Sequence, residues 1–299
     1  CVLSVFAYSF QVYADFSGYT DIAIGIALLL GFRLKTNFNS PYKAASTSEF
    51  WQRWHISLSS WLKEYLYIPL GGNREGTLGS YLVIGLMGVV ICLLSGSLWL
   101  PVLITLLLTA IIFWVLAIYF PGFRKSINTN INLMITMLLG GFWHGSSWMF
   151  ITWGGLNGLG LVIHKFWESI NPFSNWSAKW IYRGVMIFIT LTFISFTRIW
   201  FRVGSMKGGS WENVKMFFDR MAYHMGGDLF WKIVSGYKNV MLVIVIGYLI
   251  HWIPETFKQN YRIRFANLPL PAMGAVIVVV VFCLYQMMGL MQPFIYFQF

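Results

Sequence analysis

The chain has 299 residues, of which 58% are hydrophobic, 19% are aromatic and only 10% are charged. Soluble proteins carry about 25% charged residues, so this composition excludes a soluble globular domain. The net charge of +11 fits basic loops beside anionic lipid better than nucleic acid, because no dense basic run is present. Apolar runs such as 81–94 and 101–120 are continuous and, with their flanks, can cross a hydrocarbon core that needs about 20 residues. These features predict an all-α integral membrane protein rather than a β-barrel.

The first predicted helix runs from Val2 to Phe32, bends near Ser17 and carries two carboxylates, Asp15 and Asp21. Acids inside a span usually face the bundle interior, so we expect each to hold an arginine or a helix N-terminus. Their spacing places them on different helical faces, which excludes a simple acid–base pair on one helix. Because the chain begins inside this apolar segment and shows no signal peptide, we expect further transmembrane helices to precede it.

The second predicted helix spans 47–65 and begins at a capping box formed by Ser46 and Glu49. Along it, Trp51, His55 and two leucines recur at helical spacing and share one face. Charged residues on the same helix indicate an interfacial or partly re-entrant position. We expect His55 to line the reaction path; anchoring of its ring at the membrane interface is the alternative.

A turn at 69–74 is followed by a predicted helical hairpin at 78–120, which is broken at 95–97 and by Pro101. The tip of this hairpin is uncharged, whereas its outer flanks carry Arg74, Arg124 and Lys125. Cytoplasmic loops carry an excess of lysine and arginine, so we expect the tip to face away from the cytoplasm.

The segment 138–148 reads Leu-Leu-Gly-Gly-Phe-Trp-His-Gly-Ser-Ser-Trp, and its His144 is the only ionisable side chain between Ile131 and Ile163. An imidazole inside hydrocarbon is costly unless it faces a cavity or a partner, so it indicates a functional site. The flanking glycines allow the backbone to leave helical geometry or to approach another chain segment closely. His144 is therefore predicted to be catalytic; a core histidine bonded to a neighbouring helix is the alternative. The segment is short for two crossings and long for one, which favours a bent or re-entrant path.

The C-terminal half is predicted to contain a span at 181–201, an amphipathic helix within 202–238, and spans at 240–253 and 272–290. The remaining histidines lie at segment ends, where such rings commonly rest among lipid head groups; they are His164, His224 and His251. No cluster of cysteines and histidines has metal-ligand spacing, and no nucleophile elbow or phosphate-binding loop is present.

Four blocks of sequence occur in the order typical of a known family. They are 11–21 (QVYADFSGYTD), 49–59 (EFWQRWHISLS), 67–74 (YIPLGGNR) and 140–145 (GGFWHG). Together they resemble the core of the membrane-bound O-acyltransferases, and their spacing is similar to that of the bacterial alginate O-acetyltransferase branch. The tail, 292–299, also resembles that branch. The resemblance is close over 8–165 and looser beyond.

The resemblance implies a fold and a set of site residues. The fold would be a single membrane-embedded domain over 1–299, with the family core at 8–165 and further helices at 181–291. Its tilted or re-entrant helices would form a ring around a thin centre that a tunnel reaches from each side, and N-terminal helices of this ring would be missing. His144 matches the principal catalytic histidine, and His55 matches the second polar position. We expect the following residues to lie along the substrate path: Trp51, Trp54, Trp143, Asp15, Asp21, Gly140 and Gly141.

The implied function is an O-acyltransferase of the bacterial inner (plasma) membrane. It would move an acetyl group from a cytoplasmic donor, expected to be acetyl-CoA acting as substrate, toward hydroxyls of an exported polysaccharide, as in alginate biosynthesis. An envelope acetyltransferase of the serine-hydrolase type is the expected partner, alongside membrane lipids; no nucleic acid, metal or permanently bound cofactor is expected. Transfer from a thioester needs a base or a nucleophile, and His144 suits either role.

Three points stay open in this interpretation. The developing oxyanion needs hydrogen-bond donors, and His55, Trp143 or the backbone at Gly140 and Gly141 could supply them. The same fold could carry another cargo, such as D-alanine for teichoic acids. A proton-coupled transporter is a rival of a different class, but it would be expected to show internal repeats, and none is visible.

Overall fold

The computed structural model describes residues 2–173, 179–223 and 227–287, and every regular element in these ranges is helical. The predicted all-α class is therefore confirmed. The elements are α1 (Val2–Leu29), η1 (Pro41–Lys43), α2 (Thr47–Arg53), α3 (Ile56–Leu62), the π-helical η2 (Lys63–Tyr67), α4 (Leu78–Leu94), η3 (Gly96–Leu98), α5 (Trp99–Tyr119), α6 (Pro121–Trp143), α7 (Trp148–Ile170), α8 (Trp180–Gly204), α9 (Trp211–Tyr223), α10 (Gly227–Gly236), α11 (Lys238–Trp252), α12 (Glu255–Ala266) and α13 (Leu270–Met287).

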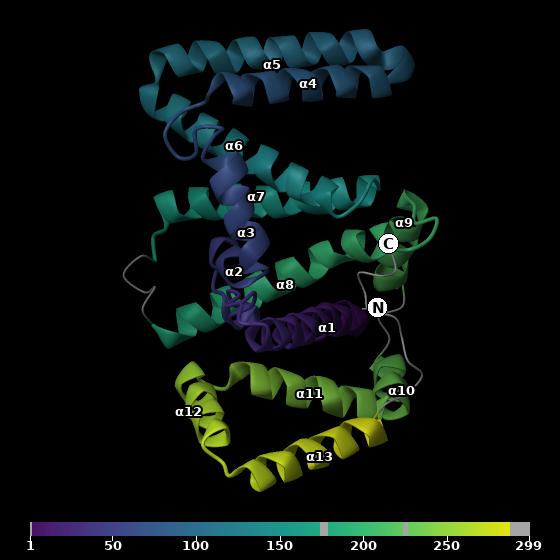
Figure 1. Ribbon diagram of the computed structural model, residues 1–299. Helices are drawn as coiled ribbons and strands as arrows, with labels where there is room; N and C mark the ends of the chain where they lie inside the picture. Colours follow the sequence, from purple (N-terminus) through teal and green to yellow (C-terminus); the bar gives the residue numbers. More distant parts are fainter. Residues whose placement is uncertain (1, 174–178, 224–226, 288–299) are drawn as a thin grey trace.

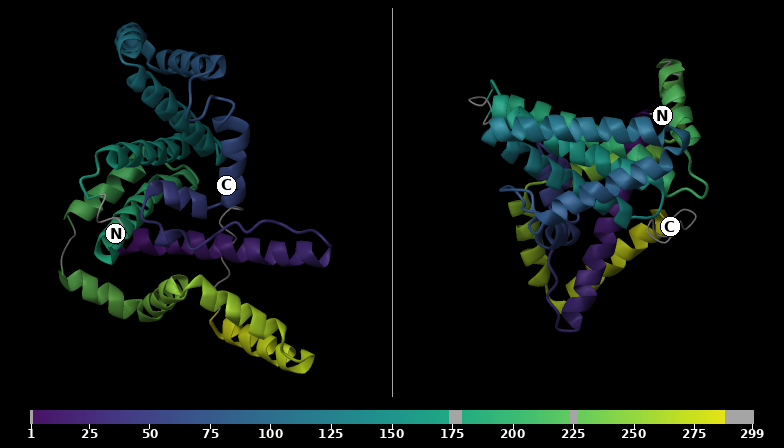
Figure 2. Two further views of the ribbon diagram at one scale, coloured as in Figure 1. Left: turned by 90° about the vertical axis from the view of Figure 1, so that its left-hand side faces the viewer. Right: turned by 90° about the horizontal axis from the view of Figure 1, so that it is seen from above.

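The long helices are stacked on one another in an order that differs from the chain order (Figure 1). The hairpin of α4 and α5 lies at one end, followed by α6, α7, α8 and α1, and α11 to α13 lie at the other end (Figures 1 and 2). α2 and α3 cross the middle of this stack, next to α7 and α8. The centre of the stack is consequently formed by α1, α2, α3, α6, α7 and α8.

Among the described residues, three helices are long and apolar enough to cross a membrane: Val2–Leu29, Gly96–Tyr119 and Trp180–Gly204. A fourth crossing results if Phe230–Gly236 and Lys238–Trp252, which are bent by 87° at their junction, count as one span. The predicted spans at the N-terminus, in the hairpin and at 181–201 are present. Pro101 does not break α5, because it lies in the first turn, where a helix needs no intrahelical N–H.

The predicted single helix over 47–65 is wrong, because it divides at Trp54 and His55 into α2 and α3. Asn37, from the preceding loop, causes the break. Its carbonyl accepts from the N–H of Ile56 at 3.0 Å and its side-chain oxygen accepts from the N–H of Ser57 at 3.2 Å. These bonds satisfy the first amides of α3, so α3 can begin anew. The common face predicted for Trp51 and His55 is lost at this break.

The predicted capping box at the start of α2 is half right. The Ser46 side chain accepts from the N–H of Glu49 at 3.0 Å, as expected. The Glu49 carboxylate reaches back to the N–H of Ala45 at 2.7 Å, one residue earlier than the motif predicts. The helix start is nevertheless where the sequence placed it.

The segment around His144 forms a tight helical hairpin of α6 and α7, which resolves the path that the sequence left open. Gly141 and Gly154 let the two helices touch. A Cβ atom on Gly154 would overlap the carbonyl oxygen of Met137, and one on Gly141 would overlap that of Phe150. Gly145 occupies the turn with φ +154, a value that side chains disfavour. Both expected uses of glycine therefore occur here.

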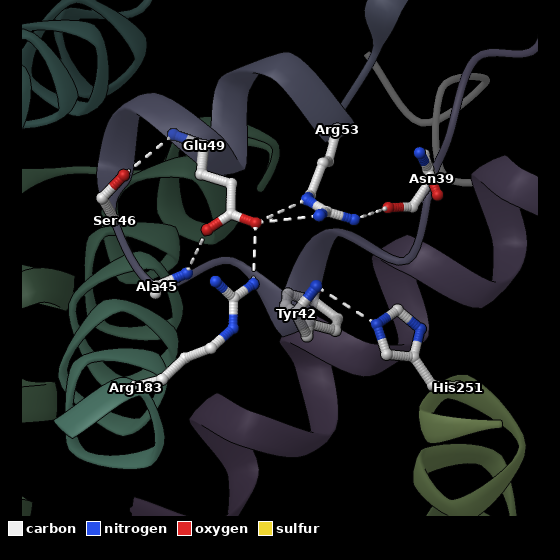
Figure 3. A network of polar contacts seen from close by, with 8 residues as sticks. All are labelled: Asn39, Tyr42, Ala45, Ser46, Glu49, Arg53, Arg183 and His251. Atoms are coloured by element: carbon white, nitrogen blue, oxygen red, sulfur yellow. Dashed lines mark hydrogen bonds and ion pairs between the residues drawn. The ribbon is translucent and has the colours of Figure 1, made fainter. Parts of the chain in front are cut away.

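The C-terminal half contains the predicted amphipathic helix as α9, whose Val214 is buried against Met149 and Val203. His251 corrects the sequence analysis, because it is only 3% exposed instead of lying at a head-group level. Its Nε2 accepts from the backbone N–H of Tyr42 at 3.1 Å (Figure 3). His224, positions 288–290 of the last predicted span and the tail at 292–299 lie outside the described residues.

Candidate active site

His144 is the residue that ends α6, at the tip of the α6–α7 hairpin. Four aromatic rings surround its imidazole. The centroid distances are 4.9 Å to Trp143, 5.1 Å to Trp153, 5.1 Å to Phe201 and 6.2 Å to Phe150. These rings come from α6, α7 and α8, so the three helices at the centre of the stack jointly fix the orientation of the imidazole.

A pocket of about 390 Å³ lies beside His144, between α2, α3 and η2 on one side and α6 and α7 on the other. Its lining is mostly apolar, with polar groups from α2, α3, η2 and α6. The lining residues are Ser48, Trp51, Gln52, Ile56, Leu58, Ser59, Ser60, Leu62, Lys63, Tyr67, Leu133, Thr136, Met137, Gly140, His144, Trp153 and Leu161. Of these described residues, His144 carries the only imidazole.

Three side-chain hydroxyls in this lining donate to nearby backbone carbonyls. Ser59 donates to the carbonyl of Trp54 at 3.1 Å, and Thr136 donates to the carbonyl of Asn132 at 2.7 Å. Ser60 likewise donates to the carbonyl of Ile56. A hydroxyl proton held by a backbone carbonyl is less available to a ligand, so these three hydroxyls suit proton exchange less well than the imidazole of His144.

His55 does not line this pocket. It lies at the junction of α2 and α3 with φ +45, and its Nδ1 is 3.2 Å from Asn37 Oδ1 and 3.3 Å from Ser57 Oγ. Its ring packs against Phe16 at 4.8 Å and against Trp143 at 6.1 Å. The indole of Trp143 thus contacts both His55 and His144.

A second hollow, of about 460 Å³, lies next to the hydrogen-bond partners of His55. Asn37 and Ser57 line it, together with Lys35, Trp61 and Glu64. The structure therefore brings the two predicted catalytic histidines to one indole ring but associates them with two different cavities.

The other predicted path residues divide into two groups. Trp51 and Gly140 line the pocket of His144. Outside it lie Trp54, which is buried among core aromatics, Trp143, which is 55% exposed, and Gly141, which faces the α7 backbone. Asp15 is half-buried and Asp21 is exposed, so the expected burial of Asp21 is wrong; neither carboxylate lines the pocket.

A carboxylate network holds α2 in place beside the pocket (Figure 3). Glu49 Oε1 pairs with Arg53 at 2.8 Å and with Arg183 of α8 at 3.2 Å, while Oε2 accepts from the N–H of Ala45. Arg53 also donates to the carbonyl of Asn39 at 3.1 Å. Burial raises the pKa of the Glu49 carboxyl, but the Ala45 amide and the two guanidinium groups outweigh it, and the pKa lies below its usual value.

Sequence reasoning missed Asn132 of α6, whose side chain is fully buried. Its Nδ2 donates to the carbonyls of Gly72 and Glu75, both at 3.2 Å, and its Oδ1 accepts from Ser80 at 2.9 Å. These bonds fasten the turn at 69–74 and the start of α4 to α6. An asparagine inside the apolar run of α6 was the available signal.

Arg198 was also missed, because the segment 181–201 was treated only as a span. It is 3% exposed, and its guanidinium lies 4.2 Å from the centroid of the Trp54 ring. Arg202 follows one turn later. An arginine within a predicted span is itself a signal of function.

The comparisons relate this chain to a family of membrane enzymes. The sequence model of the membrane-bound O-acyltransferase family matches residues 1–130 of the chain. The match ends before His144, so the role of that residue stays a prediction.

The relatives that resemble the chain are named for alginate, peptidoglycan and teichoic acid. A probable alginate O-acetylase AlgI of Pseudomonas putida is 37% identical over 188 residues, which are 62% of this chain and 29% of the relative. A peptidoglycan O-acetyltransferase of Helicobacter pylori is 36% identical over 201 residues, which are 67% of this chain and 28% of the relative. A teichoic acid D-alanyltransferase of Bacillus subtilis is 24% identical over 197 residues, which are 65% of this chain and 39% of the relative. The matched part spans less than a third of the two acetylating relatives.

Proposed function

We propose that the chain is the catalytic membrane part of an O-acyltransferase in the bacterial inner (plasma) membrane. It moves an acetyl group from a cytoplasmic donor, acetyl-CoA acting as substrate, toward hydroxyls of an exported cell-envelope polysaccharide. The observation that carries this proposal is the imidazole of His144 in the wall of the 390 Å³ pocket between α2, α3 and the α6–α7 hairpin. We further propose that 1–299 act as one domain, since the pocket draws on α2, α3, η2, α6 and α7.

The proposed chemistry uses His144 as a general base. Its neutral imidazole takes the proton of the acceptor hydroxyl while the hydroxyl oxygen forms a bond to the acetyl carbonyl carbon. The carbon–sulfur bond of the donor then breaks, and the leaving thiolate takes that proton from the imidazolium. General base catalysis is worth about 10²–10⁴-fold. Transient acetylation of the imidazole itself remains the alternative route.

The surroundings of His144 suit this role. The rings of Trp153 and Phe201 hold the imidazole edge-on and limit the access of water. The hydrogen-bond donors that the sequence offers to the oxyanion are His55, Trp143 and the backbone at Gly140 and Gly141. Trp51 is a further candidate, because its indole Nε1 is buried and bonds to no described residue. We propose Trp51 as a stabiliser of the developing oxyanion, since a pre-positioned N–H is most effective in such a site.

The relatives favour acetyl over D-alanyl cargo for this chain. The alginate O-acetylase and the peptidoglycan O-acetyltransferase named above are 37% and 36% identical, whereas two teichoic acid D-alanyltransferases are 26% and 24% identical. We propose that a serine-hydrolase-type envelope protein receives the acetyl group and completes the transfer to the polymer.

The test is a His144→Ala variant in cells that carry it as their only copy. We expect polymer O-acetylation to fall by about 10²-fold or more, because the base is removed. His164→Ala is the matched control, since His164 lies on α7 outside the pocket and contacts Glu168 at 3.3 Å. It should leave acetylation unchanged. Near-normal acetylation by membrane-inserted His144→Ala would overturn the assignment.

A further inference from the structure

Two arginines of α8 meet in a cavity that the proposed reaction does not use. This cavity has a volume of about 570 Å³, within the range of about 300–1,000 Å³ that is typical of small-molecule sites. Arg198 lies at its buried end and Arg202 at its exposed end. It shares no lining residue with the pocket of His144.

The charge on Arg198 is incompletely compensated by the described residues. The guanidinium stacks on Trp54, but its Nε has no hydrogen-bond partner in the described ranges. Arg202 likewise lies over an aromatic ring, that of Tyr8, at 5.0 Å. Neither arginine forms an ion pair with a described carboxylate, and no described acidic residue lines the cavity. A buried cation is costly without an opposite charge, so the arrangement favours an anionic ligand.

Besides the arginines, polar side chains in the cavity lining come from α1 and α8 (Ser4, Tyr8, Gln11 and Ser195), and the remaining walls, mainly from α1, α9 and α11, are apolar. These apolar walls include Val5, Phe10, Phe217, Val243 and Ile244. The walls on α1 and α11 are held together tightly, because a Cβ atom on Gly247 would overlap the ring of Phe10, which also packs on Tyr248 at 4.7 Å. A ligand that fits both ends of the cavity has an anionic head and a hydrocarbon part.

We propose that this cavity binds an anionic phospholipid. Its phosphate pairs with the guanidinium groups of Arg198 and Arg202, and the beginning of its acyl chains lies against α1 and α11. Guanidinium forms two parallel hydrogen bonds with phosphate, which suits the donors of Arg198. A lipid is favoured over free phosphate because α1 and α8, which border the cavity, are candidate membrane spans and most of its wall residues are apolar.

The test measures lipid occupancy of the purified full chain by native mass spectrometry in detergent. The probes are phosphatidylglycerol, zwitterionic phosphatidylcholine and inorganic phosphate. We expect phosphatidylglycerol to bind at least tenfold more tightly than phosphatidylcholine. Arg202→Gln should weaken this binding about tenfold, and Arg198→Gln should weaken it further. The matched control is Lys207→Gln, which removes an exposed cation just beyond α8 that does not line the cavity.

Two further arms keep the result decisive. Val243→Trp narrows the apolar part without changing charge, and it should weaken phosphatidylglycerol binding if acyl chains occupy that part. Arg202 is exposed, so Arg202→Gln carries the test if Arg198→Gln fails to fold. Equal binding of the two lipids, or unchanged affinity in Arg202→Gln, would overturn the proposal. Displacement of the lipid by millimolar inorganic phosphate, with Val243→Trp unaffected, would assign the site to free phosphate and also overturn it.

Discussion

Two helical hairpins of the described chain, α4–α5 and α6–α7, follow one another in the sequence but differ in their surroundings. Both turn at a tip rich in glycine and serine. No residue of the η3–α5 span is buried within the described chain, and Gly85 of α4 has no atom within 4 Å of an added Cβ. In α6–α7, Gly141 and Gly154 bring two backbones into contact, and the tip carries His144.

The difference shows which signals separate a lipid-facing hairpin from a site. Hydropathy already separates them, because Gly96–Tyr119 has a mean hydropathy of 2.7 and is a candidate span, whereas α6 and α7 are not. The lone ionisable residue of 131–163 adds the second signal, because an imidazole needs protein around it and hydrocarbon cannot supply a partner. The packed glycines then allow the rings of α7 and α8 to close around His144.

The largest expected effect is a difference in thiol labelling between the tip and the base of the α4–α5 hairpin, which shows the side of the membrane on which each lies. In a background without native cysteines, Ser97→Cys at the tip should react with an impermeant thiol reagent in intact cells. Asn73→Cys, beside the basic base of the hairpin, should react only after the membrane is permeabilised. Both positions are exposed in the structure, so accessibility within the protein does not limit labelling. The reverse pattern would place the hairpin base, and with it α3, on the outer side.

The second contrast concerns His55, the histidine that contacts the tip of the second hairpin through Trp143. His55→Leu should lower acetylation about 10- to 100-fold, because it removes the imidazole that contacts Asn37 and Ser57, whose side chains keep their bonds to each other, and places leucine at φ +45. His55→Asn should keep most of the activity, since asparagine tolerates this conformation and retains a donor and an acceptor. In-cell acetylation and detergent melting curves are measured together. Equal activity of the two variants would reduce His55 to an interface anchor.

The third contrast compares glycines in the two hairpins. Gly154→Ala should destabilise the chain by about 1–3 kcal/mol, because its methyl group would overlap the Met137 carbonyl and force α6 and α7 apart. Gly85→Ala should be neutral or stabilise by up to about 1 kcal/mol, since it improves helix propensity in open space. Melting temperatures in detergent report both changes. A similar loss in the two variants would mean that the α6–α7 contact does not differ in tightness from the first hairpin.

The sequence predicted the features that depend on local patterns. The hairpin at 78–120, the start of α2 at Ser46 and the amphipathic α9 follow from hydropathy, capping and periodicity, which act over a few residues. The isolation of His144 was also visible, because a single ionisable residue in an apolar run needs no structure to detect.

The features that were missed depend on partners far away in the sequence. The break at His55 arises because Asn37 caps α3, and His251 is buried because the Tyr42 amide donates to it. The cavity at Arg198 needs α1, α8, α9 and α11 to be brought together. No local pattern encodes such contacts, so the sequence could indicate a candidate residue but not its cavity.

The smallest expected effect tests how α2 is tied to the second hairpin through α8. The pKa of Glu49 is lowered in the folded chain, so its contribution to stability is present above its unfolded pKa and is lost as pH falls through the folded value. Glu49→Gln should therefore lower the melting temperature at pH 7, and the difference from the wild type should shrink as pH falls below about 4. Glu255→Gln is the control, because its partner Arg262 is exposed and 3.9 Å away. A difference that persists unchanged at low pH would mean that the shape of the Glu49 side chain, rather than its charge, holds Arg53 and Arg183 in place.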